Sequence, residues 1–222
     1  MKIDSKYHAE IKKLDVNKHE VECEYSYWEE WFEEDESMLS RVSAVKAILR
    51  KRFGRSEVVD FYKNKSDNKT KFLATMIWGH EAPAGSRRDT RGPWKVEQMF
   101  KSIEDSVVLD SIKVETESQI SSAYSAMNKA IKRCGPSFIT KHLYFLGKSL
   151  GKESYPLIYD DRVSVGLVKI SLQDTSCLDL VSIHAQAKAK AYLAYLKFAA
   201  VEAKVIGCQL DQIEYFLFKH AG

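Results

Sequence analysis

A lysine and an aspartate, Lys141 and Asp160, are the residues of this sequence whose types and spacing could do chemistry. Lys141 lies among core-type residues in the stretch PSFITKHLYF, and Asp160 follows nineteen positions later. An unprotonated lysine amine is a nucleophile, and a carboxylate beside a reacting carbon stabilises the positive charge that develops there. The alternative is structural: a lysine whose stem covers apolar surface, and an aspartate that caps a helix.

The elements that must hold these two residues are expected to be helices. Apolar residues recur at helical spacing in 117–135 and 136–151, and the short break between these segments predicts a helical hairpin. The same criterion predicts further helices at 37–53, which Gly54 would stop, and at 68–79, 93–103, 161–170, 180–207 and 209–220. Hydrophobic alternation with hairpin turns does not occur, so the predicted fold class is all-α with at most incidental strand.

Composition predicts a soluble protein that acts in the cytoplasm. The 222 residues are 45% hydrophobic and 29% charged, which suits one large domain or two small lobes. The N-terminus has no apolar signal region, and no window reaches the roughly 18 apolar residues of a membrane span. The four cysteines are far apart, and the six histidines form no closely spaced pair, so neither a metal site nor a cofactor is expected.

Charge is distributed unevenly although the net charge is only +3. Residues 21–36 hold eight acids and no base, with Trp28 and Trp31 interpreted as packing residues. Residues 118–152 hold no acid and six bases: Lys129, Lys132, Arg133, Lys141, Lys148 and Lys152. One cationic face is typical of a protein that binds a phosphate backbone, although a solvated helix surface explains the charges equally well.

The lysine-to-aspartate spacing after a helical hairpin resembles the helix-hairpin-helix DNA glycosylase superfamily, in particular its 8-oxoguanine glycosylase-like branch. The segments GPSFITKHLYF and PLIYDDRVSVGL are similar to its nucleophile and aspartate segments, and FLATMIWG and IEYFLFKHAG to its flanking helices. The resemblance covers about 70–222 and leaves 1–36 as an unmatched acidic N-terminal extension. It implies a single two-lobed helical unit over 1–222 with the active site between the lobes, and a hairpin and catalytic segment at 117–170.

The resemblance also implies roles for individual residues. Lys141 would attack the sugar C1′ and Asp160 would stabilise the charged sugar, with Asp161 a competitor one residue out of register. Phe145 lies one helical turn after Lys141, where a residue of the superfamily stacks on the everted base. Core packing is the equal alternative for Phe145. The other residues expected at the base pocket are Glu214, Phe218, Trp78, His80 and Trp94.

The expected partner is double-stranded DNA that contains a modified base, bound by a monomer. The superfamily usually has two glycines ahead of the lysine, at positions held here by Ser137 and Ile139. This departure could change how the hairpin grips a phosphate. The residues expected at the DNA backbone are Gly135, Ser137, Lys129, Lys132, Arg133, Lys148, Arg162, Arg87, Arg88 and Arg91.

The sequence leaves two alternatives for the function. The hairpin could belong to a non-catalytic DNA-binding module in which Lys141 only contacts phosphate. If the protein is a glycosylase, it could remove 8-oxoguanine in genome repair, or attack a hypermodified base in viral DNA as a defence enzyme. Lyase activity through Lys141 would make it bifunctional.

Overall fold

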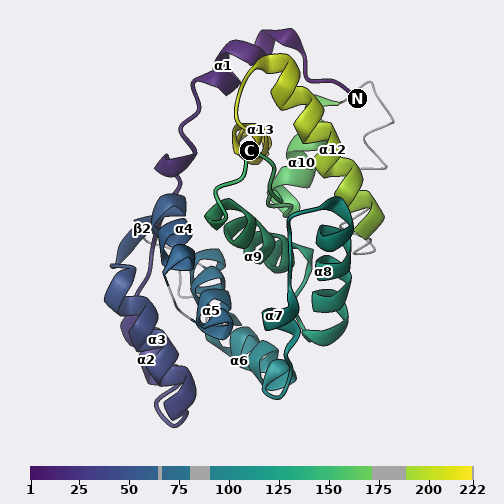
Figure 1. The fold of residues 1–222 in the computed structure, drawn as a ribbon. Helices are drawn as coiled ribbons and strands as arrows, with labels where there is room; N and C mark the ends of the chain where they lie inside the picture. The colour runs from purple at the N-terminus through teal and green to yellow at the C-terminus, as the bar shows by residue number, and fades with distance from the viewer. Residues whose placement is uncertain (65–66, 81–90, 172–188, 222) are drawn as a thin grey trace.

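A computed structural model describes residues 1–64, 67–80, 91–171 and 189–221 (Figure 1). Within these residues the chain is helical apart from two short strands, as the sequence predicts. The elements are η1 (Ser5–Tyr7), α1 (His8–Lys12), η2 (Val16–Lys18), β1 (Glu20–Glu22), α2 (Tyr25–Trp31), α3 (Glu36–Ile48), β2 (Arg52–Gly54), α4 (Arg55–Lys63), α5 (Asn68–Gly79), α6 (Arg91–Ile103), α7 (Val108–Ser111), α8 (Glu117–Ala130), α9 (Pro136–Ser149), α10 (Asp161–Ile170), α12 (Ala189–Ile206) and α13 (Leu210–Lys219).

The helices form two groups with α9 between them. In Figure 1, α1, α10, α12 and α13 lie in the upper part of the molecule, and α2 to α6 lie in the lower part. Helix α9 packs on α4 and α5 of the lower group and on α8, which in turn packs on α12 of the upper group. The residues of α9 therefore meet neighbours on most sides, and eight of its fourteen residues are buried.

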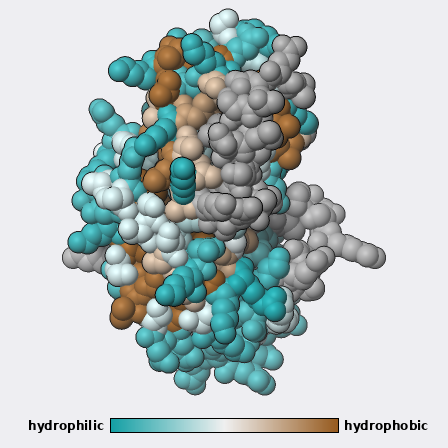
Figure 2. Space-filling model, turned by 90° about the vertical axis from the view of Figure 1, so that its right-hand side faces the viewer, coloured by the Kyte–Doolittle hydropathy of each residue, from teal (hydrophilic) through white to brown (hydrophobic). Residues whose placement is uncertain are grey.

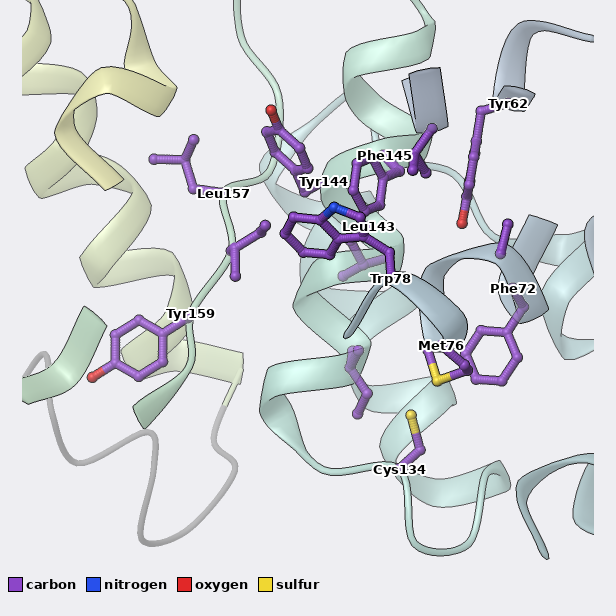
Figure 3. Packing of buried hydrophobic residues seen from close by; sticks show 14 of the residues in the cluster. Tyr62, Phe72, Met76, Trp78, Cys134, Leu143, Tyr144, Phe145, Leu157 and Tyr159 are labelled. Atoms are coloured by element: carbon purple, nitrogen blue, oxygen red, sulfur yellow. The ribbon is translucent and has the colours of Figure 1, made fainter. Parts of the chain in front are cut away.

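Helix α9 contributes a central part of the hydrophobic core. Its Leu143, Tyr144 and Phe145 pack around Trp78 of α5 (Figure 3). In the upper group, α10 and α13 approach closely at Gly166, where an added Cβ would lie 2.0 Å from the carbonyl oxygen of Leu217. Only glycine allows this contact, so Gly166 lets the middle of α10 lie directly against α13.

Most of the predicted helices are confirmed, with shifts of a few residues at their ends. The prediction of one helix over 37–53 is wrong, because α3 ends at Ile48 and residues 52–54 form β2. Strand β2 pairs antiparallel with β1, and this pairing buries Val21 and Phe53. Gly54 is therefore the N-cap of α4, a helix that the periodicity did not predict. Residues 180–188 of the helix expected at 180–207 lie outside the described residues.

The acidic N-terminal residues are built into the lower group. Tyr25, Trp28 and Phe32 are buried, while most of the acids of 21–36 are exposed. Trp31 is exposed, and its indole N–H donates to Glu97 of α6 at 3.2 Å. Amphipathic packing thus accounts for the high density of acids, since they occupy the solvent side of this segment.

The surface of the molecule is mixed. On the face that Figure 2 shows, hydrophilic residues cover most of the described surface and hydrophobic residues form smaller areas. Among the described residues, no helix combines the length and the apolar character that crossing a membrane requires.

Candidate active site

Lys141 and Asp160, the two residues that the resemblance implies for catalysis, lie in direct contact. The Lys141 ammonium donates to Asp160 Oδ2 at 2.9 Å and to Ser137 Oγ at 2.8 Å. The side chains of Lys141 and Asp160 are only 9% and 13% exposed. Ser137 stands one helical turn before Lys141, where the resemblance has a glycine, and its hydroxyl holds the amine. The pair is thus nearly buried, with a small part of each side chain exposed.

Local hydrogen bonds explain why the two residues meet. Thr140 Oγ1 donates to the carbonyl of Pro136 at 2.8 Å and accepts from the N–H of Tyr159 at 2.9 Å. This ties the segment before Asp160 to α9 beside Lys141. The last residue of α5 also fits closely here, because an added Cβ at Gly79 would lie 2.7 Å from Phe138 and 3.2 Å from Lys141 Cδ.

Asp160 is held as an anion. Its burial favours the neutral acid, but the charge and hydrogen bond of Lys141 oppose this. The N–H of Val163, which donates at 3.1 Å as Asp160 caps α10, and the charge of Arg55 add to that effect. Together they lower the pKa of Asp160 below its ordinary value. Asp161 has an exposed side chain, and the contact with Lys141 favours Asp160 for the role proposed from the sequence.

A cluster of aromatic rings lies next to this pair. His19 packs with its ring centroid 5.1 Å from Trp78, 5.8 Å from Tyr215 and 4.9 Å from Phe218. The guanidinium of Arg162 lies over the ring of Phe218, 4.1 Å from its centroid. Trp78 and Phe218, which the sequence predicted at a base pocket, are therefore close together through His19.

His19 and Tyr215 are the members of this cluster that sequence reasoning missed, and His19 is the titratable one with a shifted pKa. Burial, assisted by the positive charges of Arg55 and Lys141, lowers the pKa of His19 to about 4. Asp160 acts on it in the opposite direction, which means that His19 is near both members of the candidate catalytic pair. The sequence held no signal for it, because an isolated histidine between two short elements has no periodicity and no spaced partner.

Glu214 is placed differently from the prediction. It forms a two-pronged ion pair with Arg55, at 2.5 Å and 3.1 Å, and both side chains are almost completely buried. The guanidinium carbon of Arg55 lies 5.7 Å from the Trp78 ring and 5.5 Å from the Tyr215 ring. The carboxylate of Glu214 therefore supports the cluster from behind through Arg55.

The remaining pocket candidates are spread over several places. Phe145 is fully buried against Trp78, Tyr62 and Tyr144, so it lies in the core. The ring of His80 packs on Phe138 at 4.3 Å, in the first turn of α9.

Trp94 is partly exposed, and the guanidinium of Arg133 lies 4.7 Å from its ring. Trp94 is thus associated with the turn between α8 and α9, and the contact found for it is with Arg133 of that turn.

The cations expected at DNA separate into two sets. Lys129, Lys132 and Arg133 are exposed around the turn 131–135, where Arg133 has a positive φ of 63°. Gly135 caps α9, and no atom lies within 4 Å of an added Cβ there.

At the other end of α9, Lys148 is paired with the buried Asp211 at 2.8 Å, and Lys152 with Glu115 at 3.1 Å. Arg87 and Arg88 lie outside the described residues, as does the side chain of Arg91. Among the described residues, the cations of the turn are exposed, whereas those at the far end of α9 are paired with carboxylates.

Metal ligands do not gather in the part of the chain that the structure describes. No group of three His, Cys, Asp or Glu side chains there is close enough to hold an ion. Cys23, Cys134 and Cys208 are free thiols.

Comparison with known proteins gives one match. A family model described as "Putative 8-oxoguanine DNA glycosylase OGG-like protein" matches residues 14–218. The match begins well before the resemblance drawn from the sequence and includes the acidic segment, which was expected to lie outside it. No curated protein and no solved structure matches the chain.

Proposed function

Because the chain belongs to the family of 8-oxoguanine DNA glycosylase OGG-like proteins, we propose that it cleaves the N-glycosidic bond of a modified base everted from duplex DNA. Lys141 is the nucleophile and Asp160 the carboxylate that stabilises the charged sugar. The observation that carries this proposal is the contact of 2.9 Å between the two side chains in a nearly buried site beside the aromatic cluster.

The chemistry follows from the charges of the pair. As the bond from C1′ to the base breaks, its electrons leave with the base, and positive charge develops on the sugar. The anionic Asp160 stabilises that charge. The departing base takes a proton from the Lys141 ammonium, which frees the amine to bond to C1′. Loss of a further proton and opening of the sugar give an imine, from which strand cleavage by elimination can proceed.

The turn between α8 and α9 supplies the DNA contact in this proposal. The exposed Lys129, Lys132 and Arg133 neutralise phosphates, and the N-terminus of α9 at Gly135 presents backbone N–H groups to one more. In this proposal an everted base would stack on the partly exposed ring of Phe218, and the buried Trp78 would support the aromatic cluster from the core.

The substrate we propose is 8-oxoguanine, the base in the description of the family, in a repair role. A hypermodified base of viral DNA, removed in defence, is the second candidate. The protein would act as a monomer in the cytoplasm, where the free thiols of Cys23, Cys134 and Cys208 suit a reducing compartment.

Borohydride trapping tests the nucleophile. Wild type, Lys141→Gln and a control, Lys197→Gln, are incubated with duplexes that carry 8-oxoguanine and with genomic DNA of phages that contain modified bases. Abasic sites and covalent adducts are then counted. We expect an adduct with wild type and the control and none with Lys141→Gln.

Three other results would change the proposal. Undiminished release of the base by Lys141→Gln would remove Lys141 as nucleophile and leave a glycosylase that uses water. Tight DNA binding without any excision would favour a non-catalytic module. Excision restricted to the phage DNA would replace repair with defence.

A further inference from the structure

The N-terminal segment carries His19 into the proposed site. Helix η2 packs on α4 and α13, and the segment fits closely at Gly54, where an added Cβ would lie 3.1 Å from the carbonyl oxygen of Asn17. The side-chain amide of Gln212 anchors the same segment by donating to the carbonyl of Leu14 at 2.8 Å. His19 is therefore fixed between α4 and α13, against Trp78 and Phe218.

Two polar atoms in this cluster lack a partner within the described residues. His19 Nδ1 and Trp78 Nε1 are both buried, and neither makes a hydrogen bond to the protein. Buried polar atoms are usually satisfied, since removing one from water without compensation costs free energy. Two such atoms on neighbouring rings, beside Lys141 and Asp160, are what a site that hydrogen-bonds a ligand would contain.

The state of the imidazole decides what it can offer. With its pKa at about 4, His19 is neutral at pH 7, so one ring nitrogen carries a proton and the other is an acceptor. A buried N–H without an acceptor is rarer than a buried lone pair without a donor. The proton is thus better placed on Nε2, which leaves the buried Nδ1 as the acceptor.

We propose that His19 is a base-recognition residue, whose Nδ1 accepts a hydrogen bond from the edge of the everted base while its ring stays packed against Trp78 and Phe218. The inference rests on the proposed function and deepens it, because it names the substrate class: bases whose pocket-facing edge carries an N–H donor. It also gives the N-terminal segment a role in specificity, which the catalytic pair alone does not supply.

Two substitutions separate the ring from its nitrogen. His19→Phe keeps a ring that packs against Trp78 and Phe218 and removes the acceptor, whereas His19→Ala removes both. His8→Phe is the matched control, because His8 on α1 also has a buried ring nitrogen, Nε2, for which no hydrogen bond is found. Each variant is measured for single-turnover excision of the modified base that wild type removes, and for binding to that duplex and to one with a tetrahydrofuran abasic analogue.

We expect His19→Ala to slow excision by about tenfold to a hundredfold, because it removes the acceptor and also loosens the packing of Trp78 and Phe218. His19→Phe should slow it by about threefold to tenfold, the scale of a lost hydrogen bond. Binding to the abasic analogue, which has no base to read, should stay within about twofold of wild type, as the phosphate contacts are unchanged. His8→Phe should match wild type throughout.

The outcomes distinguish this proposal from the one on which it rests. Wild-type excision by both His19 variants would overturn the role of His19 and leave the glycosylase intact. An equal loss of binding to the abasic analogue would show a structural role, and also overturn it. A wild type that neither excises a base nor binds the modified duplex better than the abasic one would overturn both proposals. If His19→Ala fails to fold, His19→Phe, which retains a ring, still provides the test.

Discussion

Two buried ion pairs hold the upper group of helices to its neighbours, Arg55–Glu214 from α4 to α13 and Lys141–Asp160 from α9 to the start of α10, and they differ in how completely they are enclosed. Arg55 and Glu214 are 2% and 0% exposed and meet through two hydrogen bonds. Lys141 and Asp160 are 9% and 13% exposed and meet through one. The guanidinium of Arg55 cannot lose its proton and so has no reaction to perform, whereas the amine of Lys141 can become a nucleophile.

The difference suggests a division of labour. A two-pronged pair without solvent access fixes α4 against α13, and with them the rings of Trp78 and Tyr215. A single contact with some access leaves one amine able to exchange Asp160 for a substrate. We therefore expect the Arg55–Glu214 pair to be needed for folding and the Lys141–Asp160 pair for chemistry.

The largest effect is expected at the second pair. Asp160→Asn keeps the size and the capping ability of the side chain but removes its charge, so excision should fall by about two to four decades. Binding to DNA should persist or tighten, since a repulsion with phosphate is removed. Single-turnover excision and equilibrium binding, measured on the same duplex, check both statements.

Asp161→Asn is the matched control for this change, because it alters the neighbouring carboxylate at the same helix start. It should excise at close to the wild-type rate. An inactive Asp161→Asn beside an active Asp160→Asn would mean that the assignment is wrong by one residue.

Substitutions in the Arg55–Glu214 pair should change the free energy of unfolding rather than the chemistry. Arg55→Met leaves Glu214 buried without its cation, which should lower the free energy of unfolding by about 3–5 kcal/mol. The double variant Arg55→Met/Glu214→Met should recover most of this loss, because no charge then remains buried. Urea unfolding measures both. Equal loss in the single and double variants would mean that Arg55 stabilises mainly through its contacts with the aromatic rings.

A smaller effect concerns pH. The folded pKa of Asp160 is lowered, so its charge interactions stabilise the fold above the unfolded pKa, and this stabilisation is lost as the pH falls through the folded pKa. The difference in unfolding free energy between wild type and Asp160→Asn should therefore be constant above about pH 5 and shrink below about pH 4. Urea unfolding at several pH values measures it, and a difference that grows toward low pH would contradict the lowered pKa.

The fold was predictable where local pattern and tertiary structure agree. The capped, amphipathic helices at 68–79, 117–135, 136–151 and 161–170 could be identified from periodicity alone. The helix predicted at 37–53 failed because residues 52–54 pair with residues 20–22, some thirty positions away. Strand pairing depends on backbone partners that are distant in the sequence, so a local hydrophobic pattern does not predict it.

The candidate site also has residues that could be predicted from the sequence and residues that could not. Lys141 and Asp160 could be named as a pair because their residue types and spacing match a family pattern, and the structure brings the second turn of α9 against the N-cap of α10. Glu214 could not be placed, because whether a carboxylate on a helix faces a pocket depends on the cation opposite, and Arg55 is far away in sequence. His19 could not be found for the same reason, as its neighbours come from α5 and α13.

The smallest expected effect concerns the exposed lysines at the proposed DNA surface. Lys129 and Lys132 are exposed near the turn, whereas Lys152 and Lys197 are exposed lysines paired with Glu115 and Glu117, at the opposite end of α8. Each phosphate contact that is lost should reduce the slope of log affinity against log salt by about 0.9.

If the duplex docks on the turn, Lys129→Gln/Lys132→Gln should lower that slope by up to about two units, while Lys152→Gln/Lys197→Gln leaves it unchanged. The first double variant should weaken binding to modified and unmodified duplexes alike, because phosphates carry no base identity. Salt titrations of both variants on both duplexes provide the measurement. A slope that changes only in the second double variant would place the DNA at the start of α8 instead of at the turn between α8 and α9.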